Sequence, residues 1–193
     1  EKSFTFREIM RLSFADTQGE IIGRGFFKVP RKDEAPLGYP SPFWEIGMGA
    51  AEVEVDEETG EVKILKYVSL TDAGKMIHPL QCQGQDEGAA VFGIGQALFE
   101  ELVYQDGQLI NPSLVDYHLP RFRDLPQSFS TIILEEGGGP GPYGAKGIGE
   151  AGILAVAPAV CNAVYNAVGV RIQEVPLKGE SVWRVMSKKT KSP

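Results

Sequence analysis

The stretch Ala51–Leu70, AEVEVDEETGEVKILKYVSL, decides the fold of the central part of the chain. Apolar and charged residues alternate on both sides of a polar centre, as they do in strands that bury one face. The alternating apolar residues are Val53, Val55, Val62, Ile64 and Tyr67. The polar centre, Asp56–Gly60, supplies residues that tight turns favour. The stretch therefore predicts a β-hairpin with Gly60 at its turn.

Two segments downstream of the hairpin carry helical patterns. Gly84–Tyr104 repeats apolar residues at a spacing of three to four, which predicts a helix of about five turns. Four glycines lie toward one end of it, each costing about 1 kcal/mol relative to alanine in a helix, so we expect something to pack closely there. Pro158–Gly169 has valines four apart and a glycine as stop signal, and predicts a helix buried on one face that begins just after Glu150.

Shorter elements are expected in the rest of the chain. A capping box formed by Thr5 and Glu8 predicts a short helix that starts near Thr5. The other expected elements are a strand over residues 19–30, a surface loop or interlayer connection over the proline-rich residues 30–42, a strand over 171–177 and a closing helical turn over 180–186.

Composition bounds the class of protein. The 193 residues are 42% hydrophobic and 23% charged, the profile of an ordinary globular chain, so we expect a single domain or fragment over residues 1–193. A net charge of -7 with no basic cluster before the C-terminal tail argues against a nucleic-acid partner. Cys82 and Cys161 have no CxxC spacing, which favours reduced structural thiols in the cytoplasm over a metal site within this chain. No apolar run reaches the roughly 18 residues that a membrane span needs.

A glycine-rich segment, Gly137–Ile153 (GGGPGPYGAKGIGEAGI), contains a single acidic residue, Glu150. This segment and the residues around Gly84 both lead into predicted helices, whose first N–H groups are free to bind anions. A mobile surface loop followed by an acidic residue in the first helical turn would explain the same pattern. A P-loop is disfavoured because the Gly-Lys-Ser/Thr ending is missing. GAAVFGIG lies within a helix and cannot form a dinucleotide-binding turn.

Four segments, in order, resemble the molybdenum hydroxylases, the family of xanthine dehydrogenase, aldehyde oxidoreductase and the bacterial carbon monoxide and nicotinate dehydrogenases. Residues 51–79 resemble the family's strand pair followed by Asp-x-Gly and Asn-Pro. GQDEGAAVFGIGQALFEEL resembles its Gly-Gln-x-Glu-Gly helix start, and NPSLVDYHLPRFRDLP its Pro-Ser-x-x-Asp-Tyr-x-x-Pro segment. GPYGAKGIGEAG is similar to the Lys-Gly-x-Gly-Glu signature that carries the family's catalytic glutamate. The resemblance extends over residues 43–185.

The resemblance implies an α+β fold with a mixed sheet and packed helices, that of the C-terminal molybdenum-cofactor-binding domain of the large subunit. It places Glu150 beside molybdenum, as general base at a molybdenum-bound hydroxyl. The backbone before Glu150 would pass along the pterin, and Gln85 would hydrogen-bond the cofactor. The implied cofactor-binding residues are Gly84, Gln85, Asp86 and Gly88 in one segment and Lys146, Gly147, Ile148 and Gly149 in the other.

The implied reaction oxidises an aldehyde, a purine or another N-heterocycle with water as oxygen source, at a molybdenum-pyranopterin in its molybdopterin or cytosine dinucleotide form. The [2Fe-2S] clusters and FAD would belong to partner domains or subunits, beside the rest of the molybdenum subunit. The alternative is a non-catalytic assembly module that holds half of the cofactor cleft and is inactive alone. Three residues depart from the family pattern. His78 occupies the position of an asparagine, Asp86 that of an isoleucine or valine, and Phe92 that of a glutamine. We interpret His78 as a turn residue.

Overall fold

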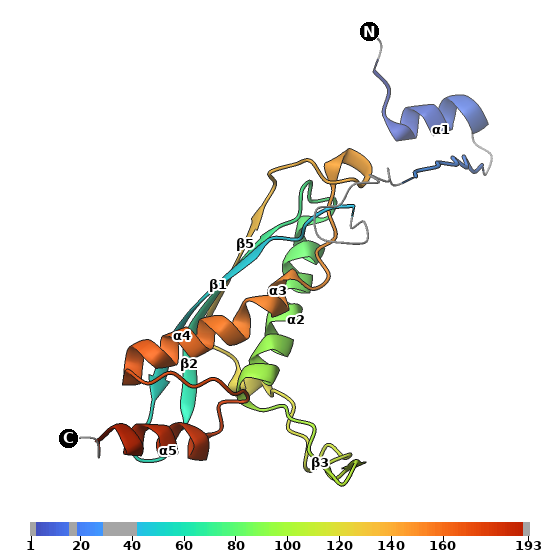
Figure 1. Cartoon of the computed structure of the whole chain (residues 1–193). Helices are drawn as coiled ribbons and strands as arrows, with labels where there is room; N and C mark the ends of the chain where they lie inside the picture. Colours follow the sequence, from blue (N-terminus) through green and yellow to red (C-terminus); the bar gives the residue numbers. More distant parts are fainter. Residues whose placement is uncertain (1–2, 16–18, 29–41, 191–193) are drawn as a thin grey trace.

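The computed structural model describes residues 3–15, 19–28 and 42–190 (Figure 1). Helices cover one face of a small mixed sheet, which confirms the α+β class. The sheet consists of β1 (Gly47–Val55), β2 (Val62–Asp72) and β5 (Ser128–Leu134), and a separate hairpin of β3 (Tyr104–Gln105) and β4 (Gln108–Leu109). The helices are α1 (Phe6–Phe14), α2 (Pro79–Leu98), α3 (Ala151–Leu154), α4 (Val156–Val168) and α5 (Gly179–Thr190), with 3-10 turns η1 (Phe122–Asp124) and η2 (Pro142–Gly144).

The predicted hairpin is confirmed and supplies two of the three strands of the sheet. β1 pairs antiparallel with β2, with Gly47 opposite Thr71 at one end. β2 also pairs in parallel with β5, with Asp72 opposite Leu134, so β2 is the central strand. The sequence analysis did not find β5. Its seven residues carry only a weak alternation, and its partner strand lies far away in the sequence.

A β-bulge in β2 sets which side chains reach the core. Glu52 and Val53 are neighbours in β1, but they pair with Lys66 and Ile64, so one residue of β2 has no counterpart in β1. Such an insertion shifts the alternation of side chains between the two faces. Ile64 and Tyr67 consequently both join the core, where they are 3% and 0% exposed.

Helix α2 begins and ends earlier than the sequence predicted. His78 caps it, because its Nδ1 accepts a hydrogen bond from the Gln81 N–H at 3.2 Å, and Pro79 occupies the first turn. This contact agrees with the interpretation of His78 as a turn residue. The residues around Gly84 therefore lie inside the helix and not at its start, so their N–H groups are used by the helix itself.

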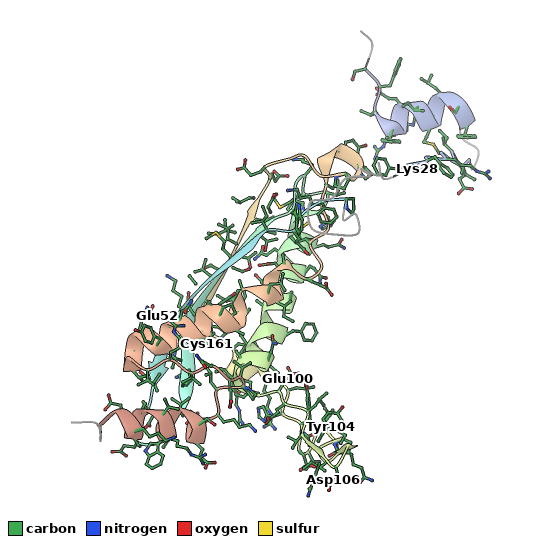
Figure 2. All side chains as sticks on the ribbon, viewed as in Figure 1. Lys28, Glu52, Glu100, Tyr104, Asp106 and Cys161 are labelled. Atoms are coloured by element: carbon green, nitrogen blue, oxygen red, sulfur yellow. The ribbon has the colours of Figure 1, made fainter. Side chains whose placement is uncertain are left out.

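The β3–β4 hairpin follows α2 where the sequence predicted further helix. Asp106 and Gly107 form its two-residue turn, with φ values of 49° and 80°. An Asp-Gly pair with positive φ at both positions is a strong hairpin signal, which the sequence analysis overlooked. Figure 2 shows Tyr104 and Asp106 at the tip of this hairpin, which projects away from the sheet.

Helix α4 is confirmed as a helix buried on one face. Val156, Val160 and Val164 recur four apart, and each is at most 1% exposed where α4 packs on the sheet beside β1. Gly169 ends the helix in the left-handed conformation, with φ 68°. The 18 residues Ala151–Val168 are apolar and long enough for a membrane span, which the sequence analysis had excluded. This window includes both α3 and α4 and is 33% buried, with Val156, Val160 and Val164 in the core.

The predictions for the remaining segments had mixed outcomes. The capping box of α1 is confirmed, since Thr5 Oγ1 accepts from Glu8 N–H and Glu8 accepts from Thr5 N–H. The strand predicted over residues 19–30 is wrong for residues 19–28, which are exposed and irregular. Of the predicted loop over residues 30–42, all but the last residue lie outside the described ranges. The strand predicted over 171–177 is wrong, and the final helical turn is the longer helix α5.

The irregular segment 171–177 has a physical reason. It does not pair with any described strand. Instead, Leu177 N–H donates to the Ala97 carbonyl at 2.7 Å, and the Leu177 side chain is 3% exposed in the core. The segment thus closes the end of α2 and leads directly into α5.

The glycines of α2 fall into two pairs with different surroundings. A Cβ at Gly93 would lie 2.5 Å from Val156 Cγ2, and one at Gly95 would lie 1.8 Å from Glu100 Oε1. These two positions confirm the expected close packing. A Cβ at Gly84 or Gly88 would have no described atom within 4 Å beyond the backbone of α2 itself. The first part of α2 therefore exposes a bare backbone face.

We predict opposite effects of alanine at the two kinds of glycine. Gly93→Ala should lower the free energy of unfolding by about 1 to 3 kcal/mol, because the added methyl forces α2 away from α4. Gly88→Ala, the matched control, should raise it by up to about 1 kcal/mol, because alanine favours the helix and meets no obstacle. Urea unfolding of both variants measures the difference. Equal effects would contradict the packing described above.

Candidate functional site

The candidate site is built around the end of β2. Asp72 ends this strand, and its Oδ1 accepts a hydrogen bond from the Gly74 N–H at 2.8 Å. Gly74 has φ +59°, and a Cβ there would lie 2.3 Å from the Gly144 carbonyl oxygen. Only glycine fits this position, because both the backbone conformation and the space exclude a side chain. The Asp-x-Gly motif thus forms a tight corner that accepts a second chain segment.

That second segment is the glycine-rich stretch before Glu150. Gly74 and Ala145 form an antiparallel bridge. Lys146 N–H donates to the Ala73 carbonyl at 2.9 Å, and Lys75 N–H donates to the Gly144 carbonyl at 3.1 Å. These bonds fix the segment against the sheet. The hydrogen bonds fix residues 144–146, which differs from the mobile surface loop expected as the alternative, while Gly147 and Gly149 are exposed.

A buried ion pair reinforces the corner. Lys146 Nζ contacts Asp72 Oδ2, and the two side chains are only 12% and 8% exposed. The hydrogen bond from Lys146 is the main cause that lowers the pKa of Asp72, and the backbone N–H of Gly74 acts in the same direction. The charged end of Lys146 is therefore occupied by Asp72. The backbone N–H of Lys146 is occupied as well, by the Ala73 carbonyl.

Glu150 follows the clamped segment by four residues. It is the N-cap residue of α3, but its side chain makes no capping hydrogen bond. Its side chain is exposed. A first-turn acid that only served the helix would be expected to contact the free N–H groups, so the carboxylate of Glu150 is available for another partner.

Gln85 connects α2 to this segment. Its Nε2 donates to the Gly149 carbonyl at 3.0 Å, across 64 positions of the sequence. The structure therefore brings together the two segments that the sequence analysis singled out separately. Gly84 and Gly88 lie on the bare face of α2, where they border an open groove of about 620 Å³ with Val91 and Phe129.

Asp86 lies elsewhere than the other predicted residues of α2. Its side chain is 0% exposed and faces β2, where Oδ1 accepts hydrogen bonds from Ser69 and Thr71. The bare face with Gly84 and Gly88 is on the other side of the helix. No signal in the sequence distinguished this buried carboxylate from an exposed one, because its partners come from a distant strand.

The backbone before Glu150 has the properties of an anion-binding segment. The N–H groups of Gly147, Ile148 and Gly149 donate no hydrogen bond to any described residue. Gly149 is exposed, and a Cβ there would have no described atom within 4 Å. A free N–H beside an open space, as at Gly149, can approach a bulky anionic group closely, whereas a Cβ at Gly147 would lie 2.9 Å from the Phe43 ring. The described residues contain no cluster of three or more His, Cys, Asp or Glu side chains that could hold a metal ion by themselves.

Comparison with known proteins gives consistent results. A family described as a molybdopterin cofactor-binding domain matches residues 1–126. The chain is 40% identical over 141 residues to the 6-hydroxypseudooxynicotine dehydrogenase complex subunit gamma of Paenarthrobacter nicotinovorans, a match that covers 71% of the chain and 18% of that protein. The chain thus spans less than a fifth of that relative's length.

Solved structures share the fold. The aldehyde oxidoreductase from Desulfovibrio desulfuricans superposes with a TM-score of 0.68 at 31% identity, over 74% of this chain and 15% of that one. Quinoline 2-oxidoreductase from Pseudomonas putida 86 superposes with a TM-score of 0.66 at 34% identity, over 70% and 18%.

The Asp72–Lys146 pair predicts a pH-dependent contribution to stability. Because the pKa of Asp72 is lowered in the folded state, this contribution is complete above the ordinary aspartate value of 3.8 and is lost as the pH falls further, through the lowered pKa. Asp72→Asn should therefore reduce the free energy of unfolding at pH 7 by about 1.5 to 3 kcal/mol, and the deficit should shrink toward pH 3. Urea unfolding across this range tests it.

The matched control is Glu180→Gln, which removes the exposed i,i+4 pair with Arg184. Such a surface pair contributes about 0.5 kcal/mol or less. A loss at Asp72→Asn no larger than at Glu180→Gln would show that the corner does not depend on the ion pair.

Proposed function

The chain belongs to the molybdopterin cofactor-binding domain family of the molybdenum hydroxylases, and on this basis we propose that it forms one wall of a cofactor cleft in which Glu150 is the general base. The substrate class is an aldehyde, a purine or another N-heterocycle. The observation that carries the proposal is the hydrogen bond from Gln85 to the Gly149 carbonyl. It supports the proposal because it joins the segment that carries Glu150 to α2, whose Gly84 and Gly88 border an open groove.

Each residue has a distinct task in this proposal. The free N–H groups of Gly147, Ile148 and Gly149 bind the anionic edge of the pyranopterin. Gln85 holds the segment that precedes Glu150 and can offer its remaining amide groups to the cofactor. When bound, the molybdenum-pyranopterin supplies the two-electron oxidation. Glu150 accepts a proton at its carboxylate, and the Asp72–Lys146 pair keeps the segment that carries Glu150 in place.

The exposure of Glu150 supports a second element of the proposal, namely that the chain works only within a larger assembly. A general base needs a pocket that excludes water, and this carboxylate is exposed in the described part of the chain. We propose that further domains of the molybdenum subunit close the cleft, and that partner subunits carry [2Fe-2S] clusters and FAD. The chain alone would then be an inactive module that holds half of the cleft.

Glu150→Gln tests the role of the carboxylate. The substitution keeps the shape and one acceptor oxygen but removes the ability to take a proton. In the assembled enzyme, turnover should fall by roughly 10²- to 10⁴-fold, while molybdenum content stays at the wild-type level. Rapid-reaction kinetics of the reductive half-reaction, with metal analysis of the same samples, measures both quantities.

Glu57→Gln is the control, because Glu57 is exposed in the β1–β2 turn, away from the site. It should leave turnover unchanged. Turnover of Glu150→Gln within tenfold of the control would reduce Glu150 to a structural residue at the start of α3.

Gln85→Ala tests the contact between α2 and the segment before Glu150. Loss of an uncharged hydrogen bond costs about 0.5 to 1.5 kcal/mol, so molybdenum occupancy or activity should fall up to about tenfold. Gln83→Ala is the matched control, since Gln83 lies on the same helix and bonds only Glu87 on the surface. Equal metal content and activity in both variants would remove Gln85 from the site.

A further inference from the structure

Asp86 is a charged residue in the apolar stripe of α2. The buried face of the helix repeats at positions 86, 90, 93 and 97, and the other three members of this row are Ala90, Gly93 and Ala97. A carboxylate in such a stripe costs free energy unless it gains compensating contacts. Violations of the apolar pattern concentrate at positions that serve function. The contacts of Asp86 can therefore have a role in the candidate site that is separate from their effect on stability.

The carboxylate is held by two hydroxyl groups of the central strand. Its Oδ1 accepts from Ser69 Oγ at 3.1 Å and from Thr71 Oγ1 at 2.8 Å. Ser69 and Thr71 are 1% and 0% exposed. They are two positions apart in β2, so their side chains lie on the same face of the strand. The pair of hydroxyls defines one position of α2 along β2. Apolar packing restricts the same position through the contact of hard atoms, and the two hydrogen bonds add a direction to it.

The second oxygen of Asp86 is buried and bonds no described group. The hydroxyl of Tyr67, the next residue on the same face of β2, is buried without a described partner as well. Burial, and after it the nearby charge of Asp86, raises the pKa of Tyr67 to about 12. Packing alone gives no reason to keep these polar groups in the core, since apolar residues of similar volume are often as stable there.

Asp86 also contacts the helix that carries Glu150. A Cβ at Gly152 would lie 2.6 Å from the Asp86 carbonyl oxygen and 2.9 Å from its Oδ1. Gly152 is two residues after Glu150, and Gln85, which bonds the Gly149 carbonyl, is the residue before Asp86. The buried carboxylate is thus the point where β2, α2 and α3 meet, directly beneath the candidate site.

We propose that Asp86 is a positioning residue, whose hydrogen bonds from Ser69 and Thr71 fix α2 on β2 so that Gln85 meets the Gly149 carbonyl and α3 presents Glu150 to the cleft. The inference rests on the proposed function for its consequence in catalysis. The geometric part concerns only contacts within this chain. A shift of α2 by its rise per residue, about 1.5 Å, would take the present Gln85 rotamer out of hydrogen-bond range of the Gly149 carbonyl.

The test compares Asp86→Asn with Asp86→Val in the purified holoenzyme. Asparagine keeps the acceptor oxygen for both hydroxyls, so it should preserve amide hydrogen exchange at residues 144–153, molybdenum content and kcat. Valine removes the acceptor and should speed exchange about tenfold at the hydrogen-bonded amides of this segment, above all Lys146 and Ile153. It should also lower kcat by as much as about 100-fold with KM little changed, because the base is misplaced while substrate contacts remain.

The double variant Ser69→Ala/Thr71→Val should reproduce Asp86→Val, since it removes the donors instead of the acceptor. Ile64→Val is the control for general loss of stability, because it truncates the core at the opposite end of β2. It should leave exchange at residues 144–153 unchanged. The readout by exchange separates positioning from simple destabilisation.

Two results would overturn the proposal. One is unchanged exchange and kcat in Asp86→Val. The other is an Asp86→Asn variant as impaired as Asp86→Val, because the charge and not the hydrogen bonds would then matter. Failure of the proposed function has a different signature: Glu150→Gln would keep its turnover, while the exchange results for Asp86 would still report on the position of α2.

Discussion

Gly74 lies opposite Ala145 in an antiparallel bridge, and this contact determines where the glycine-rich segment leaves the sheet. The corner exists because Gly74 has a positive φ and no side chain, while Asp72 closes it from inside. Lys146 then neutralises Asp72. A segment rich in glycine has a large conformational entropy to lose. Several hydrogen bonds and a shielded ion pair in one small region offset that loss, which explains how such a segment can hold Glu150 in a defined place.

Close helix packing extends the same constraint to the other half of the site. α2 approaches α4 at Gly93, which faces the Val156 side chain of α4, and α3 approaches α2 at Gly152, which faces Asp86 and Ala89. Close contacts of this kind restrict sliding of the helices, because a displacement meets hard atoms. Gln85 therefore reaches the Gly149 carbonyl from a helix that is itself fixed. The site is assembled from two rigid parts and not from one flexible loop.

The sequence predicted the parts of this structure that depend on local patterns. The β1–β2 hairpin follows from alternation and lies where the pattern placed it. α4 follows from valines four apart, but the helix expected just after Glu150 is divided into the short α3 and α4, which begins at Val156. β5 was not predicted, because its pairing with β2 is non-local. The strand predicted over 171–177 failed because its last residue, Leu177, fills the core without a neighbouring strand. Tertiary context decides such short segments.

The candidate site was predictable to a similar extent. The resemblance located Gln85 and Glu150 by their motifs, and the structure joins them through Gly149. The resemblance gave no indication that the Lys146 ammonium group pairs with the Asp72 carboxylate, since the two residues lie 74 positions apart. The burial of Asp86 was equally hidden, because it depends on which face of α2 meets β2.

Under the proposal that Glu150 is a general base, its position and its protection from water are provided by different parts of the assembly. Position is provided within this chain, through the corner at Gly74 and the contact from Gln85. Exclusion of water is not, because Glu150 is exposed in the described residues. A carboxylate that is positioned first and desolvated later remains well solvated while the cleft is open, and it becomes costly only when neighbouring domains close over it. The division lets a module of this size fold without a buried, unpaired charge at its active surface.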